Sequence, residues 1–244
     1  MRGADMAAKV WFVGAGPGNP ELITVKGLSL LKQADVLIYA GSLVNPELVA
    51  LSGATTKLDS WGMHLKDLVT SMETPAKSGK TVVRLHSGDP SLYGAIVEQI
   101  EELEKRGVSV EIVPGVSSLF AAAAALGTQL TLRGVSESLI VTRPAGKTLV
   151  HDQIRELSAL NTTMVIFLGT EKLEEITKKL VCPQDTPAAV VYHASWPDQK
   201  IVKGTVADIS QKAKKQGIEH TALLIVGGVV QPDKKGYTRS YLYT

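Results

Sequence analysis

The residues that could perform chemistry in this 244-residue chain gather in short segments rich in glycine and serine. One segment, Ser87 to Pro90 (Ser-Gly-Asp-Pro), follows a β-branched stretch over residues 81–86 and precedes an amphipathic run over 95–103. This order predicts a turn between a strand and a helix. Turns at the carboxyl ends of strands are where open α/β sheets bind ligands.

Helix capping offers an alternative interpretation of the same turn. Asp89 could be the N-cap of the following helix and Pro90 its first residue. Capping leaves Gly94 unexplained, because a glycine in a helix costs roughly 1 kcal/mol relative to alanine. The sequence therefore keeps both roles open for this turn, with a ligand site as the more informative hypothesis.

A second glycine-rich segment, Gly14 to Gly18 (Gly-Ala-Gly-Pro-Gly), follows an apolar strand predicted over residues 10–13. A dinucleotide fingerprint needs the spacing G-x-G-x-x-G, and here the residue at that third position is Asn19. Pro17 lacks the N–H group that a phosphate would use, and Ala40 stands where an acid is expected after the second strand. A nicotinamide dehydrogenase is therefore the least favoured function, although the glycines indicate a close approach of the backbone to a helix or a ligand.

The histidines and the single cysteine give no hydrolytic or metal-binding pattern. No histidine pair has the spacing of ligands on a helix, and no G-x-S-x-G elbow exists. His86 and His193 each end a predicted strand, where a histidine is more often a hydrogen-bonded wall residue than a base. Cys182 stands alone, which excludes an internal disulfide and a cysteine-rich metal site. We predict no metal site of the protein's own.

Composition limits the class of protein. Hydrophobic residues make up 44% and charged residues 20% of the sequence, and the net charge is +2. This balance is typical of globular proteins, and without a long block of like charge it does not favour nucleic-acid binding. No apolar run approaches the roughly 20 residues of a membrane span. Residues 1–9 are too polar for a signal peptide and are interpreted as a disordered leader, so we expect a cytoplasmic protein.

The elements that must position these segments fall into two halves. Strands and helices alternate over residues 10–115, which predicts a mostly parallel sheet covered on both faces. Pro114-Gly115 interrupts the pattern before an alanine-rich helix over 119–127, so we place domains at 10–115 and 116–244. A hairpin over 188–204 predicts a mixed sheet in the second domain. Small-residue loops in two α/β domains suit an uncharged or zwitterionic group-transfer cofactor.

The ordered motifs resemble those of the tetrapyrrole methylases, the S-adenosylmethionine-dependent enzymes of sirohaem and cobalamin synthesis. They are Val13–Gly18 with Leu22–Gly27, Gly88-Asp89-Pro90 with Tyr93-Gly94, Pro114–Ser118, Pro187–Gln199 and Ala222–Gly227. The resemblance extends from Val10 to about Val230. It implies an α/β fold of two domains, of the class III methyltransferase type, with the active site in the cleft between the domains, and a homodimer.

Three further segments are similar to the branch of this family that methylates C11 of precorrin-4. They are Tyr39–Val44, Leu85–Asp89 and Ala194–Asp198. Gly62–Leu65 and Ser91–Ala95 are closer to the anaerobic form, so the resemblance implies methylation of C11 of cobalt-precorrin-4 in cobalamin biosynthesis. Alternatives are another corrin position, metal-free precorrin-4, or a tetrapyrrole-binding carrier without catalysis.

The resemblance also implies roles for individual residues. The cofactor S-adenosylmethionine, and its product S-adenosylhomocysteine, would contact Pro17, Ser87, Gly88, Asp89, Leu92, Ser117, Ser118, Leu168, Ala194 and Ala222. The corrinoid would face Gly14, Gly16 and Gly18, with its carboxylates near Lys26, Arg84, Arg133 and Arg143, each of which could equally be a surface charge. His64 and His86 are the candidate proton acceptors. Cobalt would arrive within the substrate, and neither a nucleic acid nor a membrane is expected as a partner.

Overall fold

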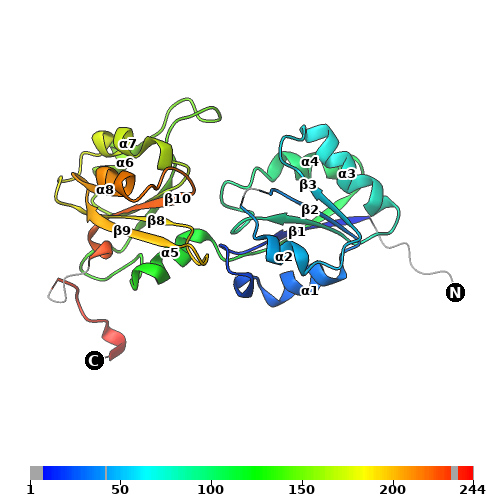
Figure 1. Ribbon diagram of the computed structural model, residues 1–244, viewed down its shortest axis with the longest axis horizontal. Coiled ribbons are helices and arrows are strands. Elements are labelled where there is room, and N and C mark those ends of the chain that lie inside the picture. The colour runs from blue at the N-terminus through cyan, green and yellow to red at the C-terminus, as the bar shows by residue number, and fades with distance from the viewer. Residues whose placement is uncertain (1–7, 42, 232–235, 244) are drawn as a thin grey trace. The chain divides into compact units, whose positions relative to one another are not determined.

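A computed structural model describes residues 8–41, 43–231 and 236–243. The chain divides between Ser118 and Leu119 into two compact units, and each is an α/β unit with a five-stranded sheet (Figure 1). The two-domain α/β fold predicted from the sequence is confirmed. The leader predicted over residues 1–9 lies outside the described residues except for its last two, of which Lys9 opens the first strand.

The first unit is an open parallel sheet. Its described strands are β1 (Lys9–Gly14), β2 (Val36–Tyr39), β3 (Thr56–Asp59), β4 (Val82–His86) and β5 (Ser109–Val113). Its described helices are α1 (Val25–Gln33), α2 (Pro46–Ala50), α3 (Leu65–Lys77) and α4 (Val97–Lys105), with the 3-10 helix η1 (Pro20–Leu22). The strand order is β3-β2-β4-β1-β5, and every pair is parallel.

Helices cover both faces of this sheet, as Figure 1 shows, with α1 and α2 on one face and α3 and α4 on the other. Alternate residues of one strand pack against the two helix layers, because successive side chains of a strand point to opposite faces. In β1, the fully buried Phe12 packs in the cluster under α3 and α4, and Val13 packs in the cluster under α1 and α2. Burial on both faces explains why the central strand β2 is apolar throughout, whereas the edge strand β3 contains exposed polar residues.

The order of the strands places a switch point between β1 and β4. After β1 the chain continues to β2, on one side of the β4–β1 pair. After β4 it continues to β5, on the opposite side of that pair. Adjacent strands whose connections diverge in this way leave a crevice beyond their carboxyl ends, where open α/β sheets bind ligands. The loops at Gly14–Gly18 and Ser87–Pro90 therefore lie at the ligand-binding edge, as the sequence indicates.

The start of α4 corrects one prediction. The helix begins at Val97 with Ile96 as its N-cap, so Asp89 and Pro90 do not start it. Asp89 instead accepts a hydrogen bond from the backbone N–H of Ser91 at 2.8 Å, which forms a local turn. By contrast, α1 starts as predicted, because the hydroxyl of Thr24 caps it by accepting from Gly27 N.

The second unit contains a mixed sheet. Its described strands are β6 (Leu139–Thr142), β7 (Thr163–Ile166), β8 (Pro187–Tyr192), β9 (Lys200–Thr205) and β10 (Ala222–Val226), in the order β6-β7-β10-β8-β9. Only β6 and β7 pair in parallel, while the pairs made by β10 and β9 are antiparallel. The predicted hairpin between β8 and β9 and the predicted mixed sheet are confirmed.

Helices of the second unit bury one face of its sheet. The described helices are α5 (Ser118–Leu126), α6 (Ile154–Ser158), α7 (Leu173–Lys179) and α8 (Ile209–Lys215), with the 3-10 helices η2 (Thr170–Lys172), η3 (Gly228–Val230) and η4 (Tyr241–Tyr243). Ile154, Ile176 and Ile209, one from each of α6, α7 and α8, are fully buried in the same apolar cluster as β7, β8 and β10. This core packs α6, α7 and α8 against the sheet of the second unit.

Candidate active site

The loops after β1 and β4 are joined through their backbones. Ala15 N donates to His86 O at 2.7 Å, and Gly16 and Gly88 exchange two hydrogen bonds, at 3.2 and 2.8 Å. These bonds consume the N–H groups that a phosphate-binding loop would offer to its ligand. The structure thus supplies a second reason, beside Pro17, why this glycine-rich segment does not form a dinucleotide site.

Three glycines from three strand ends meet at this edge of the sheet. A Cβ on Gly14 would lie 2.5 Å from the Cα of Gly115 and 2.8 Å from the carbonyl oxygen of Gly88. A Cβ on Gly115 would collide with the same carbonyl oxygen and lie 2.7 Å from the Cα of Gly14. Gly88 has a positive φ of 61°, which other residues rarely adopt. Only glycine fits at these points, so the backbone itself forms the floor of the site.

Asp89 connects its own loop to Gly115 through hydrogen bonds. Its Oδ2 accepts a hydrogen bond from Gly115 N at 2.8 Å, and its Oδ1 accepts from the backbone N–H of Ser91 at 2.8 Å and from the Ser91 hydroxyl. Partial burial opposes ionisation, but the bonds from Ser91 and Gly115 outweigh it and hold the pKa of Asp89 below its usual value. The carboxylate is therefore ionised at neutral pH and is the fixed negative charge of this edge.

The remaining predicted cofactor residues of the first unit come from the loops after β1 and β4 and from the segment after β5. Ser87, Gly88, Leu92 and Ser118 are half-buried, and Pro17 and Ser117 are buried. Ser118 is the first residue of α5, so Ser117 immediately precedes a helix. The N-terminus of that helix follows the Pro114–Gly115 turn, which Asp89 holds through Gly115.

The segment between Asp89 and α4 carries backbone strain that the sequence does not reveal. Tyr93 and Ala95 have φ angles of 55° and 47°, and a Cβ on Gly94 would collide with the carbonyl oxygen of Pro90. Non-glycine residues held in this region cost of order 1–3 kcal/mol each and cluster at functional sites. The Tyr93 side chain is 42% exposed beside the predicted cofactor loop. The unexplained Gly94 is the one sequence signal of this tight segment.

The side chains of Arg84 and His86 are buried, although His86 is the last residue of β4. Their exposed fractions are 5% and 6%, and Arg84 Nη1 and His86 Nε2 have no hydrogen-bond partner among the described residues. Burial, and then the nearby Arg84 charge, lowers the pKa of His86 to about 3, so its ring is neutral. Burial likewise lowers the pKa of Arg84 to about 10, against the opposing effect of Asp59. Both side chains are thus shielded from solvent.

The other residues predicted to bind the substrate or to accept a proton are distributed over both units. Lys26 forms an ion pair with Glu111 at 2.6 Å. In the second unit, Arg133 lies over the ring of Tyr241, and Arg143 Nη1 donates to the Thr148 hydroxyl at 2.7 Å. His64 is exposed and is the N-cap residue of α3, without a capping bond from its side chain. Gly14, Gly16 and Gly18 are all buried.

In the second unit, the predicted cofactor residues Leu168, Ala194 and Ala222 share one edge of the sheet. Leu168 follows β7 and Ala194 follows β8, while Ala222 begins the antiparallel strand β10 that lies between those two strands. The hydroxyl of Thr170 donates to Ala222 O and accepts from Ala222 N, both at 3.0 Å. These two bonds join segments that are 52 positions apart in the chain.

Strained backbone marks the same edge of the second sheet. Leu168, His193, Ser195 and Thr221 have φ angles of 53°, 45°, 74° and 54°. His193 N donates to Thr221 O at 3.4 Å, which joins two of these positions. Such strain is retained where function requires it, so the geometry supports a binding site here. The sequence gives no signal for it, since none of these residues is a glycine.

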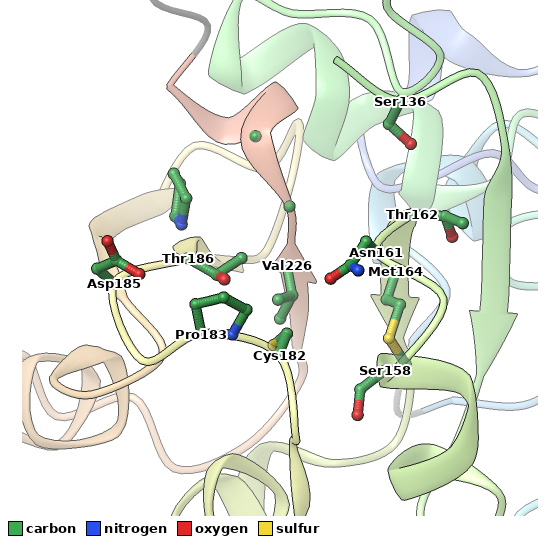
Figure 2. Close-up of a pocket in the computed structure, with 13 residues that line it drawn as sticks. Ser136, Ser158, Asn161, Thr162, Met164, Cys182, Pro183, Asp185, Thr186 and Val226 are labelled. Atoms are coloured by element: carbon green, nitrogen blue, oxygen red, sulfur yellow. The ribbon is translucent and has the colours of Figure 1, made fainter.

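A separate pocket of about 330 Å³ lies at the opposite edge of this sheet, near the start of β7 and β8 and the end of β10. Figure 2 shows its wall, with Cys182 and Val226 near the centre and Ser136 and Asp185 toward the rim. Burial raises the pKa of the Cys182 thiol, so the cysteine is not an activated nucleophile. The pocket is distinct from the predicted cofactor residues.

The described ranges hold neither a metal centre nor a membrane-spanning helix. In these ranges, no group of three or more histidine, cysteine, aspartate or glutamate residues could hold a metal ion. None of the helices found there is both long and apolar enough to cross a membrane.

The two sheets, with glycine and small-residue loops at their strand ends, form the kind of α/β scaffold that suits a group-transfer cofactor. The sequence matches the family of tetrapyrrole (corrin/porphyrin) methylases over residues 9–210. The chain belongs to this family. The resemblance inferred from the motifs is thereby confirmed.

Individual relatives match over nearly the whole chain. A cobalt-precorrin-4 C(11)-methyltransferase of Methanocaldococcus jannaschii is 50% identical over 243 residues, covering 97% of this chain and 94% of the relative. The X-ray structure of a cobalt precorrin-4 methyltransferase, a cobalamin biosynthetic enzyme, matches with a TM-score of 0.88 and 44% identity, covering 92% of this chain and 97% of that chain. A uroporphyrin-III C-methyltransferase of Thermus thermophilus, solved with S-adenosyl homocysteine, has a TM-score of 0.81 and 31% identity, and covers 92% and 100%.

Proposed function

We propose that this protein transfers the methyl group of S-adenosylmethionine to C11 of cobalt-precorrin-4 in cobalamin biosynthesis. The observation that carries the proposal is the 50% identity to a cobalt-precorrin-4 C(11)-methyltransferase across 97% of this chain. The match to a solved cobalt precorrin-4 methyltransferase supports the same reaction. Family membership alone would allow methylation at another corrin position.

The floor of the first unit fits the amino-acid part of the cofactor. Gly14, Gly88 and Gly115 leave a surface without side chains, which a Cβ at Gly14 or Gly115 would disrupt. Asp89 is ionised and fixed beside that surface, so it can attract an α-ammonium group. Ser87, Leu92, Ser117, Ser118 and Pro17 are proposed to complete this half of the cofactor site.

The strained edge of the second unit is proposed to hold the adenosine part. Leu168 is 63% exposed, whereas Ala194 and Ala222 are buried and present mainly backbone. Small residues at such an edge leave room for a flat ring and offer backbone donors and acceptors to it. Placement of the active site between the two domains stays a prediction, as does the homodimer.

S-adenosylmethionine supplies an electrophilic methyl group on a cationic sulfur. Carbon 11 of the substrate provides the electron pair for the new C–C bond, the S–C bond breaks with its pair on sulfur, and one proton leaves the substrate. No covalent enzyme intermediate is needed, so the protein has to orient the reactants and exclude water. Orientation of this kind can lower a barrier by up to ~7–11 kcal/mol.

The corrinoid carries several carboxylates, and cations are proposed to bind them. Lys26, Arg133 and Arg143 are the candidates with accessible side chains, while the buried Arg84 stays a prediction that requires repacking. Gly14, Gly16 and Gly18 are proposed to face the ring. Cobalt is proposed to arrive as part of the substrate, and metal-free precorrin-4 is the alternative substrate. His64 and His86 stay predictions as proton acceptors.

Ligand-dependent melting tests the cofactor directly. A ligand present at a hundred times its dissociation constant stabilises a folded protein by ~2.7 kcal/mol. We expect S-adenosylhomocysteine to raise the melting temperature and NAD to leave it unchanged, because the loop N–H groups at Gly16 and Gly88 are already paired. Stabilisation by NAD alone would contradict the proposal. Turnover of cobalt-precorrin-4 with S-adenosylmethionine would then separate an enzyme from a tetrapyrrole carrier.

A further inference from the structure

The turn after β8 contains a histidine held by a carboxylate. His193 Nδ1 lies 3.0 Å from both carboxylate oxygens of Asp198. The His193 ring stacks on Tyr192, with 3.8 Å between the ring centres, and lies 5.2 Å from the ring of Trp196. Its side chain is 21% exposed. The ring is therefore fixed in position by an acceptor and by an aromatic face.

This arrangement selects one tautomer of the imidazole. A carboxylate accepts from Nδ1–H, which leaves the lone pair on Nε2. The hydrogen bond to His193 lowers the pKa of Asp198 against the opposing effect of partial desolvation, so the acceptor stays ionised. The Tyr192 hydroxyl contributes to the same lowering of the Asp198 pKa. A fixed tautomer with a free basic nitrogen is the arrangement used by general bases.

The backbone of the turn holds the ring in place at an energetic cost. His193 and Ser195 both have positive φ angles, and Ser195 N donates to Gln199 Oε1 at 2.8 Å. The segment is joined to the neighbouring strand through the bond from His193 N to Thr221 O. Ala194, a proposed adenosine contact, lies between the two strained residues. His193 is thus the immediate chain neighbour of a proposed cofactor contact.

The proposed methylation needs a proton acceptor, because the sulfonium becomes a neutral thioether while the substrate loses one proton. His86 is buried and its pKa is about 3, so it is a weak base at neutral pH. His64 is exposed, and its side chain makes no capping bond that would fix the ring. We infer that His193 Nε2, oriented by Asp198, accepts the proton released in the proposed methylation. This inference rests on the proposed function.

Other charged groups near the turn have separate partners. Lys200 lies over the Tyr192 ring, with its Nζ 5.9 Å from the ring centre. On the adjacent chain segment, His220 Nδ1 lies 3.0 Å from Glu171 Oε1, but both of these side chains are more than two-thirds exposed. His220 lacks the strained backbone of His193. It is therefore a matched control, a histidine–carboxylate pair at the same edge of the sheet.

The test compares His193→Asn, Asp198→Asn and the control His220→Asn. Asparagine tolerates a positive φ, so His193→Asn is expected to fold. We expect its kcat to fall by about 100-fold or more, as for loss of a general base, with stabilisation by S-adenosylhomocysteine retained. Asp198→Asn should also lower kcat, because the tautomer is no longer fixed. His220→Asn should match the wild type in both.

A second measurement tests the tautomer without turnover. Imidazole ¹⁵N NMR should show His193 protonated on Nδ1 and unprotonated on Nε2 in mildly basic solution, with this preference lost in Asp198→Asn. A His193→Asn kcat within threefold of the wild type, or a His193 protonated on Nε2, would overturn the inference. An inactive wild type that shows the expected tautomer would instead contradict the proposed function, so the two failures are distinguishable.

Discussion

Replacing Gly115 with alanine is expected to destabilise the protein by about 3 kcal/mol and to abolish stabilisation by S-adenosylhomocysteine. The new Cβ would collide with the carbonyl oxygen of Gly88 and lie 2.7 Å from the Cα of Gly14. Backbone atoms cannot move aside as a flexible side chain can, and overpacking typically costs 1–3 kcal/mol or more. The shift would also weaken the bond between Gly115 N and Asp89. Chemical denaturation and ligand-dependent melting check both effects.

Gly146→Ala is the matched control for this substitution. A Cβ at Gly146 meets no atom within 4 Å, and this residue has no positive φ. We expect its free energy of unfolding to stay within about 0.5 kcal/mol of the wild type. A Gly115→Ala protein as stable as Gly146→Ala, with normal binding of S-adenosylhomocysteine, would contradict the close packing of the three glycines.

Acidification from about pH 7 to about pH 4 is expected to cost the wild type about 3 kcal/mol of stability through His86 alone. The pKa of His86 is about 3 in the folded chain, below its ordinary value of 6.5, because burial and the Arg84 charge oppose protonation. Between these two values the unfolded chain binds more protons, so stability falls as the pH falls. Each pKa unit corresponds to about 1.36 kcal/mol.

Substitution of His86 isolates this contribution. His86→Leu removes the titrating group from a buried position that lies beside the ring of Phe12. We expect the variant to lose the part of the pH dependence that lies below about pH 6.5, as measured by urea denaturation across that range. His64→Leu, at an exposed position, should keep the wild-type dependence. Parallel pH profiles for the wild type and His86→Leu would show that His86 is not held neutral by burial.

Much of the fold can be predicted from the residue types and their spacing in the sequence. The β-branched stretch before Ser87 and the amphipathic run after Gly94 give β4 and α4, because strand and helix periods differ. Thr24 predicts the start of α1 through its capping hydroxyl. The third glycine, Gly18, stands one position too early for a dinucleotide fingerprint, and Pro17 lacks a backbone N–H group. Residue type and spacing alone therefore argue against a dinucleotide-binding site. Three-dimensional packing then adds the backbone pairing of Gly16 with Gly88.

Other features depend on contacts between distant parts of the chain. Asp89 has the sequence signature of a helix N-cap, yet it binds Gly115, 26 residues away. The burial of Arg84 and His86 follows from α4, where Gln99 Oε1 accepts a hydrogen bond from Arg84 Nε at 3.4 Å. The positive φ of His193, at the end of β8, could not be predicted from its residue type or from the pattern around it. Tertiary context decides these features.

The measurement that tests the central claim most directly is the position of the transferred methyl group. The purified protein is incubated with cobalt-precorrin-4 and S-adenosylmethionine labelled with ¹³C in its methyl group, and the product is analysed by NMR. We predict one labelled methyl on C11 and one equivalent of S-adenosylhomocysteine. A label on another carbon, or no transfer while the corrinoid binds, would contradict the proposed reaction.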